Sequence, residues 1–589
     1  MLKRTTKVTS LLITAASIIS MVPAMAADVK KVAAEEGTVY QMKAEPGSTY
    51  LDAELNGADD AVYVYRDGKY TKLDGAESGD KFGDIFTYEG KTYLQMADGD
   101  YYVNVANGER TDDDIKGNID DDADTVLRKL IKSDNDGRFD KDFVKGNIVS
   151  EIDHDTSKTL FGGATCRRYN YDLDKPFVYD GIYTKNVSAI YSDEKGNYVD
   201  GDYNLGNIGV RSTDAGVTIK NTEDTYTLKV NGINYEIKAE IENISSFAVD
   251  SNYIYRTAAL SIWGRTVGST GGFSTNLTGD VYFGSASSKH KQTTGTYVDN
   301  CTSVRVMQKI SKAQASDEID GIKYSKDVKT YFITDSDGKD QPLLGLSDKD
   351  NAASDSAGFG WFTVGTQGYI VGQYHDIANK RQYAETVNLK SEDGYNYTDV
   401  GDADSVDVAY VDSSNPDTYA YAIGCGDHYV LSKDGYIEEF IAKDNKYEKL
   451  YKVDGGMNKI DISLPVFAAV WNQNDGNYSL ITPGAPAGDA KATTDATTTA
   501  AAITTTSVVT TGWAKAADGT WSFVKADGTK ATAWLQDGTT WYYLNATGVM
   551  QTGWINDKGT WYYCNGSGAM LANTTVDGYV LGANGAWVK

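Results

Sequence analysis

Residues 511–589 repeat two aromatic motifs at a spacing of about 20 residues, and this repeat limits how the end of the chain can fold. A unit of about 20 residues cannot bury its own apolar face, so neighbouring units must stack on one another. Seven of the ten tryptophans lie in these units, which is more aromatic surface than so short a segment needs for packing. The copies are Gly512-Trp513, Ala533-Trp534 and Gly553-Trp554 for one motif, and Trp521-Ser522-Phe523, Trp541-Tyr542-Tyr543 and Trp561-Tyr562-Tyr563 for the other.

Each unit is expected to be a β-hairpin followed by a connector, so that the whole segment forms a β-hairpin repeat solenoid. Because successive side chains of a strand point to opposite faces, Trp541 and Tyr543 should share one face while Tyr542 points to the other. Stacking should bring Trp554 near the strand aromatics of the preceding unit. Aromatic side chains at fixed intervals can bind cations or sugars, or they can pack only against each other.

The third unit carries the most complete form of the pattern, with Gly553-Trp554, Trp561-Tyr562-Tyr563 and Gly568-Ala569-Met570 in succession. This run resembles the cell-wall-binding, choline-binding-type repeat of choline-binding surface proteins. Similar repeats occur in glucan-binding proteins and in the receptor-binding arrays of clostridial toxins. The resemblance covers about 75 residues of the C-terminal module and none of the body. It implies aromatic cages for the trimethylammonium group of teichoic-acid choline, held by cation–π attraction.

The family pattern, placed on this sequence, implies one complete cage for choline or a wall glycan. Its residues are Trp534, Trp541, Tyr543, Met550 and Trp554. The first unit departs from the pattern, because it has Phe523 for the second tyrosine and Lys530 where a methionine is expected. A lysine beside a cage would repel a cation.

A partial second cage follows the complete one. It comprises Trp561, Tyr563 and Met570 together with Trp554, but Thr574 stands where the closing tryptophan is expected. Arrays of this kind gain affinity from several sites acting together. With one complete site, binding of choline alone should be weak.

The first 26 residues are typical of a secretory signal peptide. Lys3 and Arg4 precede an apolar run at 11–21, and Ala24-Met25-Ala26 is a cleavage signal of small residues. Removal of Lys3, Arg4 and Lys7 would change the formal charge from −27 to −30. So acidic a chain argues against binding to nucleic acid or to an anionic membrane. No further long apolar run follows, so no membrane span is expected.

Residues 27–482 are predicted to be a large, acidic, tyrosine-rich all-β body. Short strands alternate with Asp-Gly turns, which are a strong hairpin signal, at Asp67-Gly68, Asp434-Gly435 and Asp475-Gly476. Their number favours a propeller, a sandwich or several small β domains. Two helices are expected, at Asp122–Lys132 and at Val306–Ala315, and they suggest soft boundaries near 145 and 310. Residues 483–510, rich in threonine, alanine, proline and glycine, should form a linker.

The body has no recognisable catalytic motif, so the sequence assigns no catalytic residue and no cofactor. Its four histidines form no HExxH pattern. The segment Asp134-Asn135-Asp136-Gly137 resembles part of a calcium loop, although the first and twelfth ligand positions are wrong for an EF-hand. Asp134 and Asp136 are therefore candidate ligands of an irregular calcium site, and a solvated acidic loop is the alternative.

The sequence thus predicts a secreted surface protein of a Gram-positive bacterium, held non-covalently at the cell wall by its C-terminal repeats. The expected partner of the repeats is a wall polymer, either teichoic-acid choline or another glycan. The body would be an adhesion or interaction domain for a host or surface ligand. Two alternatives remain at this point: an extracellular wall or glycan hydrolase, and a structural protein of an S-layer type.

Overall fold

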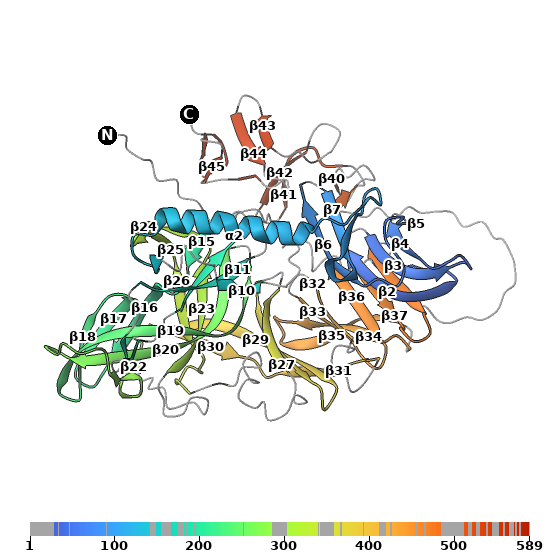
Figure 1. Ribbon diagram of the computed structural model, residues 1–589. Coiled ribbons are helices and arrows are strands. Elements are labelled where there is room, and N and C mark those ends of the chain that lie inside the picture. The colour runs from blue at the N-terminus through green and yellow to red at the C-terminus, as the bar shows by residue number, and fades with distance from the viewer. Residues whose placement is uncertain are drawn as a thin grey trace. The chain divides into compact units, whose positions relative to one another are not determined.

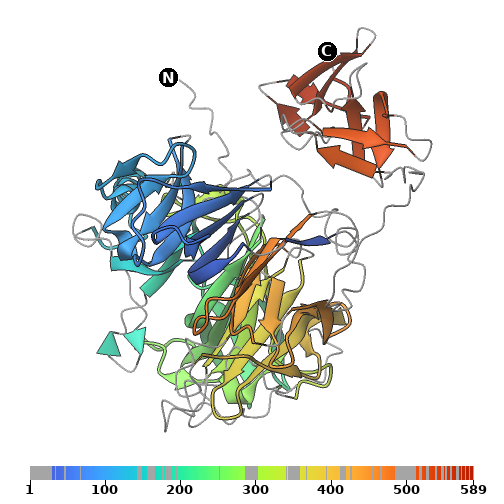
Figure 2. The same cartoon turned by 90° about the vertical axis from the view of Figure 1, so that its right-hand side faces the viewer.

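A computed structural model describes residues 29–483 and 512–587 with internal gaps, of which the longer are 142–148, 155–165, 285–302, 342–358 and 412–419. The described residues form two compact units, one within 29–483 and one within 512–587 (Figures 1 and 2). Both consist mainly of β-strands, which confirms the predicted fold class. The expected signal peptide at 1–26 lies outside the described residues, as does the expected linker apart from Pro483.

Four sheets of the body have four antiparallel strands each. We name them sheets A to D. Sheet A contains β6 (Phe82–Tyr88), β7 (Lys91–Met96), β8 (Tyr101–Asn104) and β9 (Arg110–Thr111); sheet B contains β2 (Gly37–Glu45), β3 (Ser48–Leu55), β4 (Ala61–Arg66) and β5 (Lys69–Lys72). Sheet C has the order β1 (Val29–Val32), β38 (Tyr478–Pro483), β37 (Phe467–Trp471), β36 (Lys459–Leu464); sheet D contains β32 (Tyr421–Gly424), β33 (Asp427–Leu431), β34 (Tyr436–Ile441) and β35 (Lys446–Lys452).

The Asp-Gly signals predicted these hairpins correctly. Strands β4 and β5, β33 and β34, and β37 and β38 pair antiparallel across the three turns. Gly68, Gly435 and Gly476 have φ values of 79°, 74° and 74°. Glycine adopts this left-handed conformation without the steric cost that a Cβ atom would bring, so the turn residue sets the hairpin.

Three further sheets complete most of the body, and we name them E, F and G. Sheet E has eleven strands, namely β18 (Tyr226–Val230), β19 (Ile233–Val249), β20 (Tyr253–Thr266), β23 (Val304–Ser311), β26 (Val328–Phe332), β30 (Tyr395–Val400), β29 (Arg381–Glu392), β28 (Ile370–Asp376) and β27 (Phe359–Val364), with β21 (Thr275–Asn276) beside β20 and β31 (Asp404–Asp407) beside β29. Sheet F has the order β10 (Val149–His154), β11 (Arg167–Asp172), β14 (Val187–Ser192), β15 (Tyr198–Asp200), β25 (Ile322–Ser325), β24 (Gln314–Ile319); sheet G has the order β17 (Gly216–Asn221), β16 (Asn204–Arg211), β22 (Tyr282–Phe283). A separate pair is β12 (Val178–Tyr179) with β13 (Ile182–Tyr183).

The predicted helix at Val306–Ala315 is wrong, because this segment begins in strand β23 of sheet E. β23 lies between β20 and β26 and pairs antiparallel with both. The β-branched residues of Val304–Ser311 are compatible with either conformation over so short a stretch. Because this segment pairs with a strand on each side, it is a strand and not a helix, and Ile310 lies within it.

The predicted helix at Asp122–Lys132 is confirmed, and it is longer than expected. Helix α2 runs over Ile115–Asp134, and the Asp114 side chain caps it by accepting a hydrogen bond of 2.8 Å from the Gly117 N–H. One face buries Leu127 and Ile131, which pack against sheet F. Near its start, Ile115 packs against Tyr93 and Tyr102 of sheet A. The helix therefore joins two sheets, as Figure 1 shows.

The sheets pack face to face in a closed circuit. Buried hydrophobic clusters are shared by sheets A and B, B and C, C and D, D and E, and E and F. Helix α2 then links sheet F back to sheet A. The first strand, β1, completes sheet C by pairing with β38, so the two ends of the body meet in one sheet.

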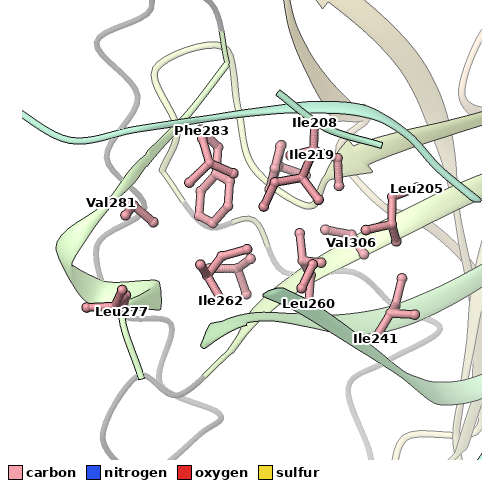
Figure 3. Packing of buried hydrophobic residues seen from close by; sticks show 14 of the residues in the cluster. Leu205, Ile208, Ile219, Ile241, Leu260, Ile262, Leu277, Val281, Phe283 and Val306 are labelled. Atoms are coloured by element: carbon pink, nitrogen blue, oxygen red, sulfur yellow. The ribbon is translucent and has the colours of Figure 1, made fainter. Parts of the chain in front are cut away.

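The sequence left a propeller, a sandwich and several small β domains open, and part of this circuit shares features with the first of these. Face-to-face packing of successive four-stranded sheets and closure by the first strand are features of a propeller. These features apply to sheets A to D. Sheet E, with eleven strands, is far larger than a propeller blade, and helix α2 lies where a further sheet would be. Sheet G packs on one end of sheet E over the largest hydrophobic cluster, to which Leu205, Ile262 and Phe283 belong (Figure 3).

Candidate functional site

The C-terminal unit consists of four antiparallel hairpins in chain order (Figure 2). This confirms the predicted hairpin repeat. The hairpins are β39 (Gly512–Lys515) with β40 (Trp521–Val524), β41 (Ala533–Asp537) with β42 (Thr540–Leu544), β43 (Gly553–Asp557) with β44 (Thr560–Cys564), and β45 (Thr574–Val576) with β46 (Tyr579–Leu581). Each contributes too little apolar surface to be stable alone, so the contacts between hairpins hold the unit together.

Successive hairpins are joined by one backbone contact that recurs. The Met550 N–H donates to the Trp521 carbonyl oxygen at 2.7 Å, and the Met570 N–H donates to the Trp541 carbonyl oxygen at 2.8 Å. At the end of the unit, the Trp587 N–H donates in the same way to the Trp561 carbonyl oxygen at 2.8 Å. The connector after each hairpin therefore returns to the tryptophan on the second strand of the hairpin before it.

Trp534 forms an aromatic corner with two tyrosines. In its own hairpin it lies opposite Tyr543, with ring centroids 5.1 Å apart and planes at 71°. From the next hairpin, Tyr562 approaches the same indole, with centroids 4.8 Å apart and planes at 69°. Such edge-to-face pairs are favourable because the positive ring edge meets the negative ring face. The corner thus spans two repeats and fixes how one hairpin sits on the next.

Trp541 lies beside this corner and is exposed. It is two residues from Tyr543 on β42, so both side chains point to the same face of the strand. Its exposed fraction is 39 %, and that of Trp561 at the same position of the next hairpin is 38 %. The exposed indoles are large apolar surfaces that the fold of the hairpins does not require to be buried.

The structure places the other expected cage residues as follows. The main-chain N–H of Met550 is hydrogen-bonded to Trp521, in the first hairpin. The methionine whose main chain is hydrogen-bonded to Trp541 is Met570. Trp554 pairs with Tyr563 across the third hairpin, although its side chain is outside the described part of the chain.

Met570 itself packs at the end of the unit. A Cβ atom on Gly585 would lie 2.6 Å from the Met570 sulfur, so the methionine side chain lies directly against the last turn. Trp561 and Tyr563 share strand β44, where both have described side chains.

The contact of Tyr562 with Trp534 is stacking of one repeat on the next, and the sequence alone did not identify Trp534 as the ring that Tyr562 meets. Strand alternation within a hairpin gives the face of a residue but not which neighbouring hairpin it reaches. The interior of the unit is apolar, with Leu544 and Cys564 fully buried at equivalent positions. Burial raises the pKa of the Cys564 thiol to about 11, so the thiol is neutral and fills space.

Of the two candidate calcium residues, Asp134 has a partner for its carboxylate and Asp136 has one for its main chain. The Asp134 carboxylate accepts a hydrogen bond of 2.7 Å from the Tyr198 hydroxyl, and the Asp136 N–H donates to the Asp320 carbonyl oxygen at 2.7 Å. Among the described residues, no group of three or more histidine, cysteine, aspartate or glutamate side chains is arranged to hold a metal ion.

Comparison with known families agrees with this geometry. The family of the choline-binding repeat matches residues 531–574, which contain the Trp534 corner. The C-terminal unit is a choline-binding repeat module. The match covers part of this module and no part of the body, and a comparison with curated proteins found no match.

Among solved structures, the chain is similar to choline-binding proteins of Streptococcus pneumoniae. The choline binding domain of Spr1274 is 46 % identical over 14 % of this chain and 96 % of that chain, with a TM-score of 0.13. Choline binding protein F is 18 % identical over 65 % of this chain and 99 % of that chain, with a TM-score of 0.13. The choline-binding domain of CbpL is 19 % identical over 29 % of this chain and 92 % of that chain, with a TM-score of 0.09.

The described residues include no helix that is long and apolar enough to cross a membrane.

Proposed function

We propose that this protein is a secreted surface protein that its C-terminal choline-binding repeats hold non-covalently at the cell wall, by binding choline of teichoic acid. The observation that carries the proposal is the aromatic corner of Trp534, Tyr543 and Tyr562, with the exposed Trp541 on the adjoining surface. A quaternary ammonium gains roughly 0.5–2 kcal/mol from each aromatic face that it contacts.

The proposed cage is completed by a partner from the next repeat. Trp534, Trp541 and Tyr543 come from the second hairpin, and Trp554 with Tyr562 from the third. The partial second cage, with Trp561, Tyr563 and Met570, lacks its closing tryptophan, since threonines occupy positions 574 and 575 at the start of the fourth hairpin. Only the first of the two proposed cages therefore has a closing tryptophan, so equivalent substitutions in the two cages should differ in their effect on choline binding.

The body is proposed to act as an adhesion or interaction domain that the repeats present at the surface. Its described surface is built from short strands and turns on a closed circuit of sheets, which is a rigid support for exposed loops. The ligand of the body is a host or surface molecule in this proposal.

One observation favours a second candidate, a glycan hydrolase. Burial raises the pKa of the Glu439 carboxyl to about 7, with further contributions from the nearby Asp427 and Glu448 carboxylates. The Tyr429 hydroxyl donates to this carboxyl at 3.2 Å. A carboxyl that stays protonated near neutral pH is what a glycosidase uses as its general acid.

The proposal is tested by sedimenting the full-length protein with purified walls that contain choline and with walls from cells grown on ethanolamine instead. Retention only by choline walls is expected. Equal retention by both kinds of wall would refute choline as the ligand. The hydrolase candidate requires a clearing zone on a wall zymogram that Glu439→Gln abolishes, and it is refuted if the native protein gives no clearing.

A further inference from the structure

One part of the body's surface gathers four cationic side chains around a tyrosine, although acids outnumber bases by 83 to 56 in the whole chain. It lies around the turn between β33 and β34 of sheet D and the facing side of β35. We call it the lysine–tyrosine patch, and its residues are Arg381, Lys433, Tyr436, Lys449 and Lys452. Arg381 belongs to β29 of sheet E, so the patch joins two sheets of the body.

Two lysines of the patch lie over one tyrosine ring. The Nζ atoms of Lys449 and Lys452 are each 4.2 Å from the centroid of the Tyr436 ring. The cause is a β-bulge in β35. Glu438 pairs with Lys449 and Ile437 pairs with Tyr451, so Leu450 is left without a partner in the register.

The bulge matters because residues three apart would otherwise point to opposite faces of a strand. With the extra residue between them, Lys449 and Lys452 point to the face of Tyr436, which pairs with Lys452. Both lysines are exposed, and Tyr436 is partly so. The arrangement is therefore set by the backbone and not by a chance meeting of long side chains.

The two ammonium groups are close together and incompletely neutralised. In the part of the chain that the structure describes, neither forms an ion pair with a carboxylate, and Lys452 donates to the main-chain oxygen of Asp434. Glu438, opposite Lys449, is buried with 8 % exposure. Like charges held near one ring repel each other, so an anion placed between them would relieve the repulsion.

The other side of the turn carries two more cations that share one acid. Arg381 Nε is 2.6 Å from Asp407 Oδ1, and Lys433 Nζ contacts the other carboxylate oxygen. Hydrogen bonds from Lys433 and then from Arg381 lower the pKa of the Asp407 carboxyl, so it stays ionised. Asp407 balances one of the two positive charges, and the Asp434 carboxylate also acts on Lys433. The side chains of Lys433 and Arg381 are 59 % and 45 % exposed, so both remain accessible.

We propose that the lysine–tyrosine patch binds phosphate groups of a polyol-phosphate polymer of the cell wall. Lysine presents a compact point charge that suits a phosphate oxygen, and the tyrosine face between the two lysines offers an apolar support for the polyol carbons. The net negative charge of the chain opposes long-range attraction, but at physiological salt charges beyond about 8 Å are largely screened. The local cations then decide whether an anion binds.

This site lies in the body and recognises the charge opposite to that of choline. It goes beyond the anchoring function, and only the choice of a wall polymer as the ligand rests on that proposed function. The test uses the full-length protein with free choline in excess, so that the repeats are occupied. The probe is choline-free poly(glycerol phosphate), and binding is measured by biolayer interferometry at several salt concentrations.

We expect binding that weakens as salt rises, because phosphate contacts are electrostatic. The pair Lys449→Ala and Lys452→Ala should weaken it at least fivefold. The matched control is Lys69→Ala with Lys72→Ala, which removes two exposed lysines of β5 that lie over no ring among the described residues. The control should bind as the native protein does. Lys449→Arg with Lys452→Arg should retain binding, which separates loss of charge from loss of the strand.

Three results would overturn the proposal. They are no binding of the phosphate polymer, an equal loss in the control pair, and equal binding of polygalacturonate, whose anions are carboxylates. Each leaves the choline result unchanged, because that result is read from the repeats.

Discussion

Replacing Trp541 by alanine should weaken choline binding, whereas replacing Trp561 should do so much less. The two residues are a matched pair. They occupy the same position in successive hairpins and are 39 % and 38 % exposed, so truncation removes a similar amount of packing in each case. Trp534 is a poorer target, because it holds Tyr543 and Tyr562 and its loss would also loosen the stacking of the hairpins.

The expected rise in Kd follows from the number of aromatic faces that each substitution removes. One cation–π contact contributes roughly 0.5–2 kcal/mol, which corresponds to a roughly 2- to 30-fold rise in Kd for Trp541→Ala. Trp561 belongs to the cage that lacks its closing tryptophan, so Trp561→Ala should change Kd by less than about twofold.

Isothermal titration of the full-length protein with choline measures both values, with circular dichroism as the check on folding. Equal losses in Trp541→Ala and Trp561→Ala would refute the assignment of the complete cage to the second and third hairpins. An unchanged Kd in both would refute aromatic recognition of the cation.

Three further predictions concern the body. The folded pKa of Glu439 is raised from 4.5 to about 7, so its contribution to stability is fully present below pH about 4.5 and is lost as the pH rises through about 7. Guanidinium unfolding at pH 5 and pH 8 should show that Glu439→Gln removes about 2 kcal/mol of this pH dependence, and an identical dependence in both proteins would contradict it. Gly321 has φ of +84° and a Cβ there would lie 1.7 Å from the Asp134 carbonyl oxygen, while Gly232 has φ of +80° with nothing within 4 Å. Gly321→Ala should therefore cost about 2–4 kcal/mol of unfolding free energy and Gly232→Ala about 1 kcal/mol, and equal costs in urea unfolding would show that the close approach does not matter. Arg256 is buried and lies 2.6 Å from Asp202, so Arg256→Met should cost about 3–5 kcal/mol by leaving a buried charge unpaired. Adding Asp202→Asn should restore part of this loss, and a double variant as unstable as the single one would argue against the ion pair as the cause.

Short-range patterns predicted much of the secondary structure. Asp-Gly turns place φ-positive glycines between two strands, and this local chemistry alone fixed hairpins such as β33 and β34. The same local reasoning failed at Val304–Ser311, because a short run of apolar residues fits a helix or a buried strand. The segment is a strand because it pairs with two neighbouring strands from other parts of the chain.

The arrangement of the sheets was beyond the reach of the sequence. Val29 pairs with Pro483, and no local pattern relates two residues so far apart. The same holds for α2, whose length and cap can be read from its residues but whose role in joining sheets F and A cannot.

The repeat module was easier to predict, since its period and its aromatic motifs define hairpin and connector. What the sequence did not give was the neighbour of each ring. Tyr562 meets Trp534 of the hairpin before it, and Met570 follows its own hairpin but returns to Trp541. Both contacts depend on how far a connector turns the next hairpin, which is a property of the assembled solenoid.

The most direct test of the account is elution of the wall-bound, full-length protein by free choline. Purified choline-containing walls are loaded with the protein, washed, and treated with increasing choline, with equal concentrations of sodium chloride as the control. The account predicts release by choline at concentrations where the salt releases none, with Trp541→Ala eluting earlier than the native protein. Protein that stays bound in excess choline, or that choline and salt release equally, would contradict anchoring through the aromatic cage.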